Sequence, residues 1–245
     1  MTEDQWLTSA DASAMLGFIR NRATSRKLRL FAVAIAKPFF FLMDDRRSFR
    51  ALSTAERWAD NECSANEVDL ARRRAWDAIK DLPEEPFAKV IAARAAARVA
   101  ESDAYSAALW TQNEIVELWA TLKEGKSSDG AHESYWEGRK KGEADVANTL
   151  RHLLGNPFRR TFSGVPRSKS ITRLAESIYQ NGATSARRPR FSQQDVVGKK
   201  LGSLRDALFS TGYPDLAAHF TEDTSRSHPK GCWVLDIVLG REPNT

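Results

Sequence analysis

The feature that most limits how this chain can fold is the near absence of a strand pattern. No useful run of alternating Val, Ile or Thr occurs, and the one Asn-Gly pair, Asn181-Gly182, follows a segment with helical spacing. Apolar residues instead recur at intervals of three and four, as at Leu28, Phe31 and Ile35. The sequence therefore predicts an all-α fold, an irregular bundle of about nine to eleven helices.

Local signals predict where helices in the first half of the chain begin and end. A first helix is expected over residues 9–21, and Thr24 or Ser25 is expected to cap the next one. Pro38 should kink or split that second helix, because proline cannot donate the backbone hydrogen bond that a helix interior needs. Ser64-Ala-Asn-Glu67 has the pattern of a capping box. A long helix over 84–123 follows, with a break near Ser102-Asp103 as the alternative.

In the second half, glycines and prolines divide the chain. A helix is expected over 132–154, weakened by Gly138 and Gly142 and ended at Gly155. Another is expected over 171–180 and ended by Gly182, followed by a polar, basic loop over 183–191. A helix capped by Ser192 and a short helix after it lead to the closing helix, Cys232–Leu239.

Length and composition indicate an ordinary helical protein without covalent staples. The chain has 245 residues, 42% hydrophobic and 28% charged, which fits one large domain or two small ones. A division near residue 155 gives an N-terminal helical region, 1–155, and a C-terminal region, 156–245, unless both form one continuous domain. Only two cysteines occur, and neither a secretory leader nor a membrane span is apparent, so we expect free thiols in the cytoplasm.

Positive charge is concentrated in one segment. The net charge is +5, yet residues 156–205 contain eleven basic and two acidic residues, which gives +9 there and −4 elsewhere. Such a segment suits an acidic protein partner or the phosphates of a nucleic acid. The candidate binding residues are Arg159, Arg160, Arg187, Arg188, Arg190, Phe191, Lys199 and Lys200. We expect a non-enzymatic protein-interaction or adaptor module, with a nucleic-acid-binding protein as the alternative.

Both ends of the chain carry a resemblance. The opening Met1-Thr-Glu-x-x-Trp6-Leu, the run Ser25-Arg-Lys-Leu-Arg-Leu-Phe-Ala32 and the final Gly231-Cys-Trp-Val-x-Asp-x-x-Leu-Gly240 resemble a family of uncharacterised helical bacterial proteins of planctomycete type. The resemblance implies a helical fold and no particular chemistry. Related sequences often have two adjacent cysteines after the Leu-Phe-Ala run, where this chain has Val33-Ala-Ile-Ala-Lys37.

The closing stretch, 228–240, holds the residues most capable of chemistry. His228 lies four residues before Cys232, and His219 lies nine residues before His228. A Cys/His set can bind zinc tetrahedrally, with Asp236 as a poor fourth ligand, but the chain has no Cys-x-x-Cys pair. Burial of Cys232 and Trp233 in the core is the better explanation of the pattern, so the sequence predicts no metal site and no cofactor.

A weaker alternative is a cysteine-dependent enzyme. Cys232 stands at the beginning of a helix, where a thiol has a lowered pKa, and His228 could act as its base. No sequence context typical of a cysteine enzyme surrounds either residue. Asp236 lies on a mostly apolar helix, so we expect it to pair with an arginine, a backbone amide or an indole N–H and to have a structural role.

Overall fold

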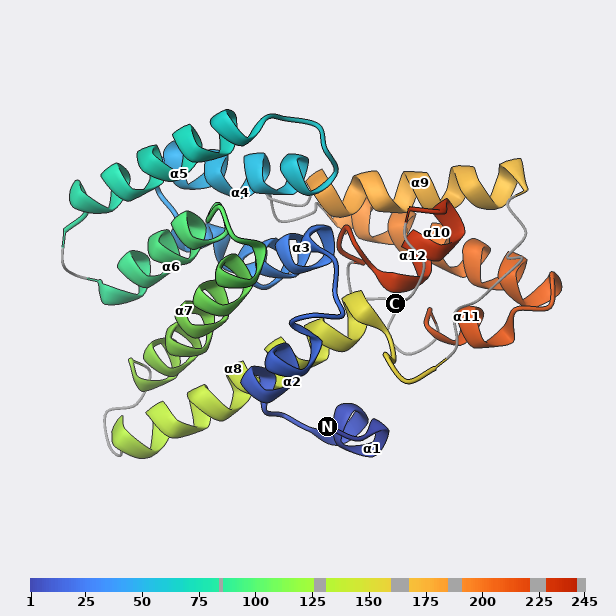
Figure 1. Cartoon of the computed structure of the whole chain (residues 1–245), viewed down its shortest axis with the longest axis horizontal. Coiled ribbons are helices and arrows are strands. Elements are labelled where there is room, and N and C mark those ends of the chain that lie inside the picture. The colour runs from blue at the N-terminus through green and yellow to red at the C-terminus, as the bar shows by residue number, and fades with distance from the viewer. Residues whose placement is uncertain (84–85, 126–130, 160–167, 185–190, 221–227, 242–245) are drawn as a thin grey trace. The chain divides into compact units, whose positions relative to one another are not determined.

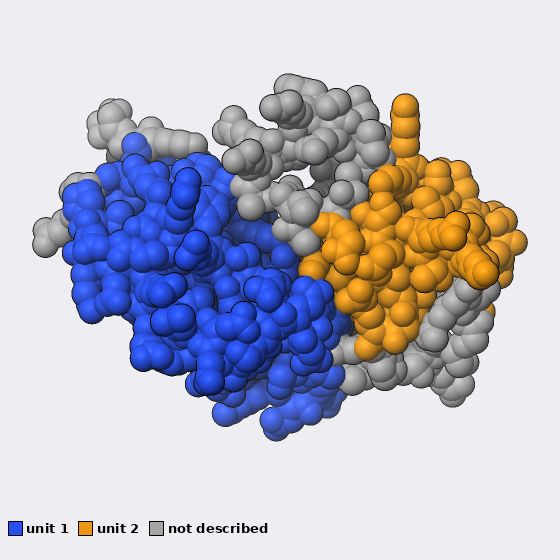
Figure 2. All heavy atoms as spheres, turned by 90° about the horizontal axis from the view of Figure 1, so that it is seen from above, with its two compact units in different colours: residues 1–151 blue, residues 152–245 orange. Residues whose placement is uncertain are grey.

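The computed structural model describes residues 1–83, 86–125, 131–159, 168–184, 191–220 and 228–241 (Figure 1). Within these ranges the fold is all-α, with twelve α-helices, one 3₁₀ helix and no strand. This confirms the predicted fold class. The chain forms two compact units, Met1–Arg151 and His152–Thr245, which Figure 2 shows in different colours. Among the described residues, no helix combines the length and the apolar character that a membrane span requires.

Unit 1 contains seven complete α-helices, one 3₁₀ helix and most of an eighth α-helix. They are α1 (Glu3–Thr8), α2 (Ala12–Ile19), α3 (Ser25–Ala36), the 3₁₀ helix η1 (Lys37–Leu42), α4 (Arg46–Ala59), α5 (Ala65–Lys80), α6 (Phe87–Arg98), α7 (Ala104–Glu124) and the greater part of α8 (Ala131–Leu154). Helix α3 packs against α7 and α4, while α6 packs against α7 and α5. The core is rich in alanine, especially along α6 and α7, where small side chains allow helices to approach closely.

Most helix ends in unit 1 follow the local sequence signals. Thr24 caps α3, Ser64 and Glu67 form the predicted capping box of α5, and the chain changes from α-helix to 3₁₀ helix immediately before Pro38. The long helix predicted over 84–123 is wrong, because the chain breaks between α6 and α7 and Asp103 caps α7. The break expected near Ser102-Asp103 as the alternative is the one observed.

Two glycines in α8 have a role that the sequence pattern did not indicate. A Cβ atom on Gly138 would lie 2.6 Å from the backbone oxygen of Trp119, and one on Gly142 would lie 3.0 Å from the Trp119 side chain. Both distances are shorter than van der Waals contact. The glycines therefore allow α8 to approach α7 closely, and they are packing residues rather than weak points.

Unit 2 begins with the last turn of α8 and contains four further helices. These are α9 (Lys169–Thr184), α10 (Phe191–Ser210), α11 (Pro214–Ala218) and α12 (Trp233–Leu239). Helix α10 packs against α9 and α11, and α12 packs against α9. Their shared core includes large side chains from each helix or its end, among them Tyr179, Leu204, Leu216, Phe220 and Leu235.

Two boundaries in unit 2 differ from the sequence analysis. Helix α9 does not end at Gly182 but continues to Thr184, because a single glycine costs a helix only about 1 kcal/mol and packing can outweigh that cost. Phe191, expected in a loop, is the first residue of α10. The greater part of the predicted loop over 183–191 lies outside the described residues.

Candidate metal centre

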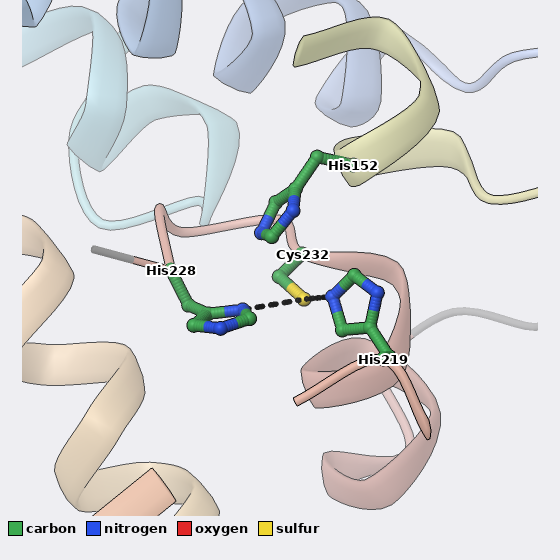
Figure 3. Close-up of side chains that lie close together, drawn as sticks. All are labelled: His152, His219, His228 and Cys232. Carbon is green, nitrogen blue, oxygen red and sulfur yellow. Dashed lines mark hydrogen bonds between the residues drawn. The ribbon is translucent and has the colours of Figure 1, made fainter. Parts of the chain in front are cut away.

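Three of the four histidines of the chain and one of its two cysteines meet in unit 2. His152, His219, His228 and Cys232 each direct one potential ligand atom into a common space, and these atoms all lie within 4.8 Å of one another (Figure 3). Among the described residues, this is the one group of three or more His, Cys, Asp or Glu side chains arranged closely enough to share a metal ion. The convergence is specific, since most of the chain's nitrogen and sulfur ligands take part.

Three separate pieces of chain supply these four side chains. His152 lies in the last turn of α8, and His219 is the residue at which α11 ends. His228 belongs to the short segment before α12, and Cys232 is the N-cap residue of α12. The site therefore forms only when the end of α8, the end of α11 and the beginning of α12 are all folded.

Glycines shape the backbone on both sides of the cluster. Gly155 ends α8 with a φ of 69°, and a Cβ atom there would lie 3.0 Å from the Trp233 side chain. Gly231 has a φ of 85°, and next to it the Cys232 N–H donates a hydrogen bond to the Pro229 oxygen at 3.1 Å. Glycine adopts such angles without strain. The two glycines thus let the indole of Trp233 pack beside the end of α8 and let the chain turn so that Cys232 reaches the histidines.

The distances between ligand atoms suit a tetrahedral ion. Zinc bonds of about 2.0–2.1 Å to nitrogen and about 2.3 Å to sulfur separate neighbouring ligand atoms by about 3.3–3.6 Å. The Cys232 Sγ lies 3.1 Å from His219 Nε2 and 3.6 Å from His228 Nδ1 (Figure 3). The His152 ring centroid lies 4.6 Å from that of His219 and 4.7 Å from that of His228. Small side-chain adjustments would place all four atoms around one ion.

Burial keeps the cluster in the protonation state that metal binding requires of histidine. Burial, helped by the nearby His228, lowers the pKa of His219 to about 3, and burial lowers the pKa of His228 to about 4. Both imidazoles are therefore neutral at physiological pH, and a neutral ring offers a nitrogen lone pair. The Nε2 atom of His152 is buried and makes no hydrogen bond to the described residues, although its ring contacts the other two histidines.

The set of ligands also limits the chemistry. Three imidazoles and one thiolate suit zinc, whereas carboxylate oxygens would suit calcium or magnesium. Four protein ligands would fill a tetrahedral coordination sphere and leave no position for substrate or a reactive water. Cys232 and His228 are buried, at 0% and 4% exposure, while His152 and His219 are half-buried. This arrangement has the character of a structural site.

Only part of this cluster was predictable from the sequence, and His152 was not among the predicted residues. From the sequence, His219, His228 and Cys232 were a possible zinc set with Asp236 as a poor fourth ligand, and no metal site was predicted. Asp236 is not among the grouped residues. It is 1% exposed in the core of unit 2, so it does not face solvent, as expected of a residue with a structural role. The partner of its carboxylate stays a prediction. No sequence spacing connects His152 with the others, since it belongs to a distant helix.

The pair suggested for cysteine chemistry is also in place, but it is inaccessible. His228 Nδ1 lies 3.6 Å from Cys232 Sγ, as a general base would. However, the thiol is fully buried, and His219 lies closer to it than His228 does. A nucleophile has to meet its substrate, so burial favours a structural role or metal ligation over covalent catalysis.

The expected binding residues of the basic segment are only partly described. Arg159 and Lys199 are exposed, and Lys200 donates a hydrogen bond from Nζ to Ser177 Oγ at 2.5 Å. Phe191 begins α10, but its side chain is outside the described part. Arg160, Arg187, Arg188 and Arg190 lie outside the described residues. A joint surface of these residues therefore stays a prediction.

Comparisons with known proteins add no relative: no family model, no curated protein and no solved structure matches the chain. The resemblance to helical bacterial proteins of planctomycete type stays an expectation from the sequence.

Proposed function

We propose that this protein is a non-enzymatic interaction module whose C-terminal unit is stabilised by a structural Zn²⁺ ion. The observation that carries the metal proposal is the convergence of His152, His219, His228 and Cys232 within unit 2, with ligand atoms within 4.8 Å of one another. The ion would connect the end of α8, the end of α11 and the beginning of α12. A structural role follows from the complete set of protein ligands and from burial.

The alternative explanation is a metal-free core cluster held by hydrogen bonds. The contact of 3.1 Å between Cys232 and His219 is compatible with an S–H···N hydrogen bond. An ion would instead engage one ligand atom from each of the four residues at the same time. The two explanations differ in one measurable property, the metal content of the purified protein.

Metal analysis of the reduced protein tests the proposal. We expect one zinc ion per chain, and we expect replacement by Co²⁺ to give the absorption of a tetrahedral cobalt site with a thiolate-to-cobalt charge-transfer band. Cys232→Ser should abolish that band. Cys63→Ser should keep it, because Cys63 lies in unit 1, where its Sγ contacts the Thr54 oxygen at 3.4 Å. A wild-type protein that binds neither metal would exclude the proposal.

A metal ion with four protein ligands has no position for a substrate, so we place the biological activity at the surface of the molecule. This agrees with the protein-interaction role expected from the sequence, which we retain as part of the proposal. The nucleic-acid alternative is tested by titrating duplex and single-stranded nucleic acid at two salt concentrations, because binding through phosphates weakens steeply with salt. Absence of binding at low salt would eliminate it.

A further inference from the structure

A second feature, in unit 1 and independent of the metal centre, bears on the partner. Helices α4 and α5 lie side by side (Figure 1) and form a surface groove of about 150 Å³. Its lining residues are spaced by three and four along each helix, so they form one face of α4 and one face of α5. They are Arg47, Arg50, Thr54, Glu67, Leu70, Ala71 and Arg74.

Only some of the charged side chains in this groove have partners within the protein. The Glu67 carboxylate accepts hydrogen bonds from Ser64 N at 2.9 Å and Ser64 Oγ at 3.0 Å, so it serves the cap of α5. Arg47 is held by Asp45 at 2.7 Å and by Asp81 at 2.5 Å. The one acid and one of the three arginines are therefore occupied by local contacts.

Arg50 and Arg74 differ from Arg47. Both are exposed, and neither forms an ion pair with any residue in the described part of the chain. Leu70, which lines the same groove, is 43% exposed although it is a large apolar side chain. Two guanidinium groups without an ion pair in the described part of the chain, in the same groove as an exposed leucine, complement a ligand that carries carboxylates and an aliphatic side chain.

We propose that the groove between α4 and α5 binds an acidic peptide segment of a partner protein, with carboxylates on Arg50 and Arg74 and an aliphatic side chain on Leu70. A nucleic acid fits less well, because its backbone has phosphates but no aliphatic group for Leu70. The inference specifies the partner chemistry of the interaction role proposed above, and it does not depend on the metal. It also assigns the partner to unit 1, whereas the basic segment that the sequence favoured belongs to unit 2.

The test uses the full chain and a short fluorescein-labelled peptide built from repeats of Glu-Glu-Leu-Ala-Glu. Fluorescence anisotropy at low salt should show saturable binding, and R50Q/R74Q should weaken it about tenfold or more. The matched control is R46Q/R73Q, which removes the same charge from the same two helices but outside the groove. This control should bind within about twofold of the wild type.

A second pair of measurements tests the apolar contact and the class of ligand. Leu70→Ala should also weaken binding, and a peptide with Gln in place of Glu should not bind. Equal losses in R50Q/R74Q and R46Q/R73Q would show non-specific charge attraction and overturn the proposal, as would absence of peptide binding at low salt. Displacement of the peptide by inorganic phosphate or duplex RNA at similar concentrations would overturn the choice of peptide. Zinc content measured on the same samples separates these outcomes from failure of the metal proposal.

Discussion

Addition of Zn²⁺ to metal-free protein should stabilise unit 2 and leave unit 1 nearly unchanged. All four candidate ligands belong to residues 152–245, and no comparable group of ligands occurs in the described part of unit 1. An ion that binds only the folded state adds RT ln(1 + [Zn]/Kd), which is about 4 kcal/mol when free zinc exceeds Kd by a thousandfold. The prediction is therefore a large effect confined to one part of the molecule.

The expected shift in melting temperature follows from the size of the unit. For a domain of about 60–100 residues, 1 kcal/mol moves Tm by roughly 4–8 °C, so 4 kcal/mol corresponds to roughly 16–32 °C. Scanning calorimetry of the reduced protein, in chelator and in buffered zinc, measures this shift. Hydrogen exchange read by mass spectrometry then assigns it, because peptides from 168–184 and 228–241 should gain protection while peptides from α3 and α7 should not.

Matched variants distinguish ligation from general effects of zinc. His219→Ala should lose about 1.4 kcal/mol of the zinc-dependent stabilisation for each tenfold loss of affinity. His132→Ala removes the one histidine outside the cluster and should retain the full effect. Each variant is compared with its own metal-free state, so a change in basal stability does not affect the readout. Equal zinc effects in both variants, or no zinc effect in the wild type, would refute the assignment of the ligands.

Two further predictions concern helix packing and the accessibility of the thiols. Gly138→Ala should destabilise unit 1 by about 1–3 kcal/mol in chemical denaturation, because its Cβ atom would meet the Trp119 backbone. The control Gly17→Ala has no neighbour within 4 Å, so it should cost nothing and can stabilise by up to about 1 kcal/mol. An unchanged stability in Gly138→Ala would disprove the close approach of α8 to α7. Iodoacetamide should modify Cys63 of the native reduced protein well before the fully buried Cys232, as peptide mass spectrometry can show. Faster labelling of Cys232 would favour the cysteine-enzyme alternative instead.

The helical architecture was accessible from the sequence because its signals are local. Thr24 and the Ser64–Glu67 pair satisfy the first N–H groups of their own helices, and Pro38 lacks a donor wherever it is placed. The same local reading gave the wrong end for α9. Gly182 carries an intrinsic helix penalty, but the stability of a helix in a protein depends mainly on the face that it buries, and α9 contributes Ile171, Ala175 and Ile178 to the core of unit 2.

The amino-acid sequence by itself determined the fold class, most helix caps and the candidate residues near the C-terminus, since each depends on neighbours within about one helical turn. Only the tertiary structure decided that His152, on a helix distant in sequence, completes the group formed by His219, His228 and Cys232 and that Asp236 does not. It likewise decided that Arg50, Leu70 and Arg74 line one groove. A binding site depends on distances between atoms of different helices, and those distances are fixed by packing, which no residue spacing along one chain records.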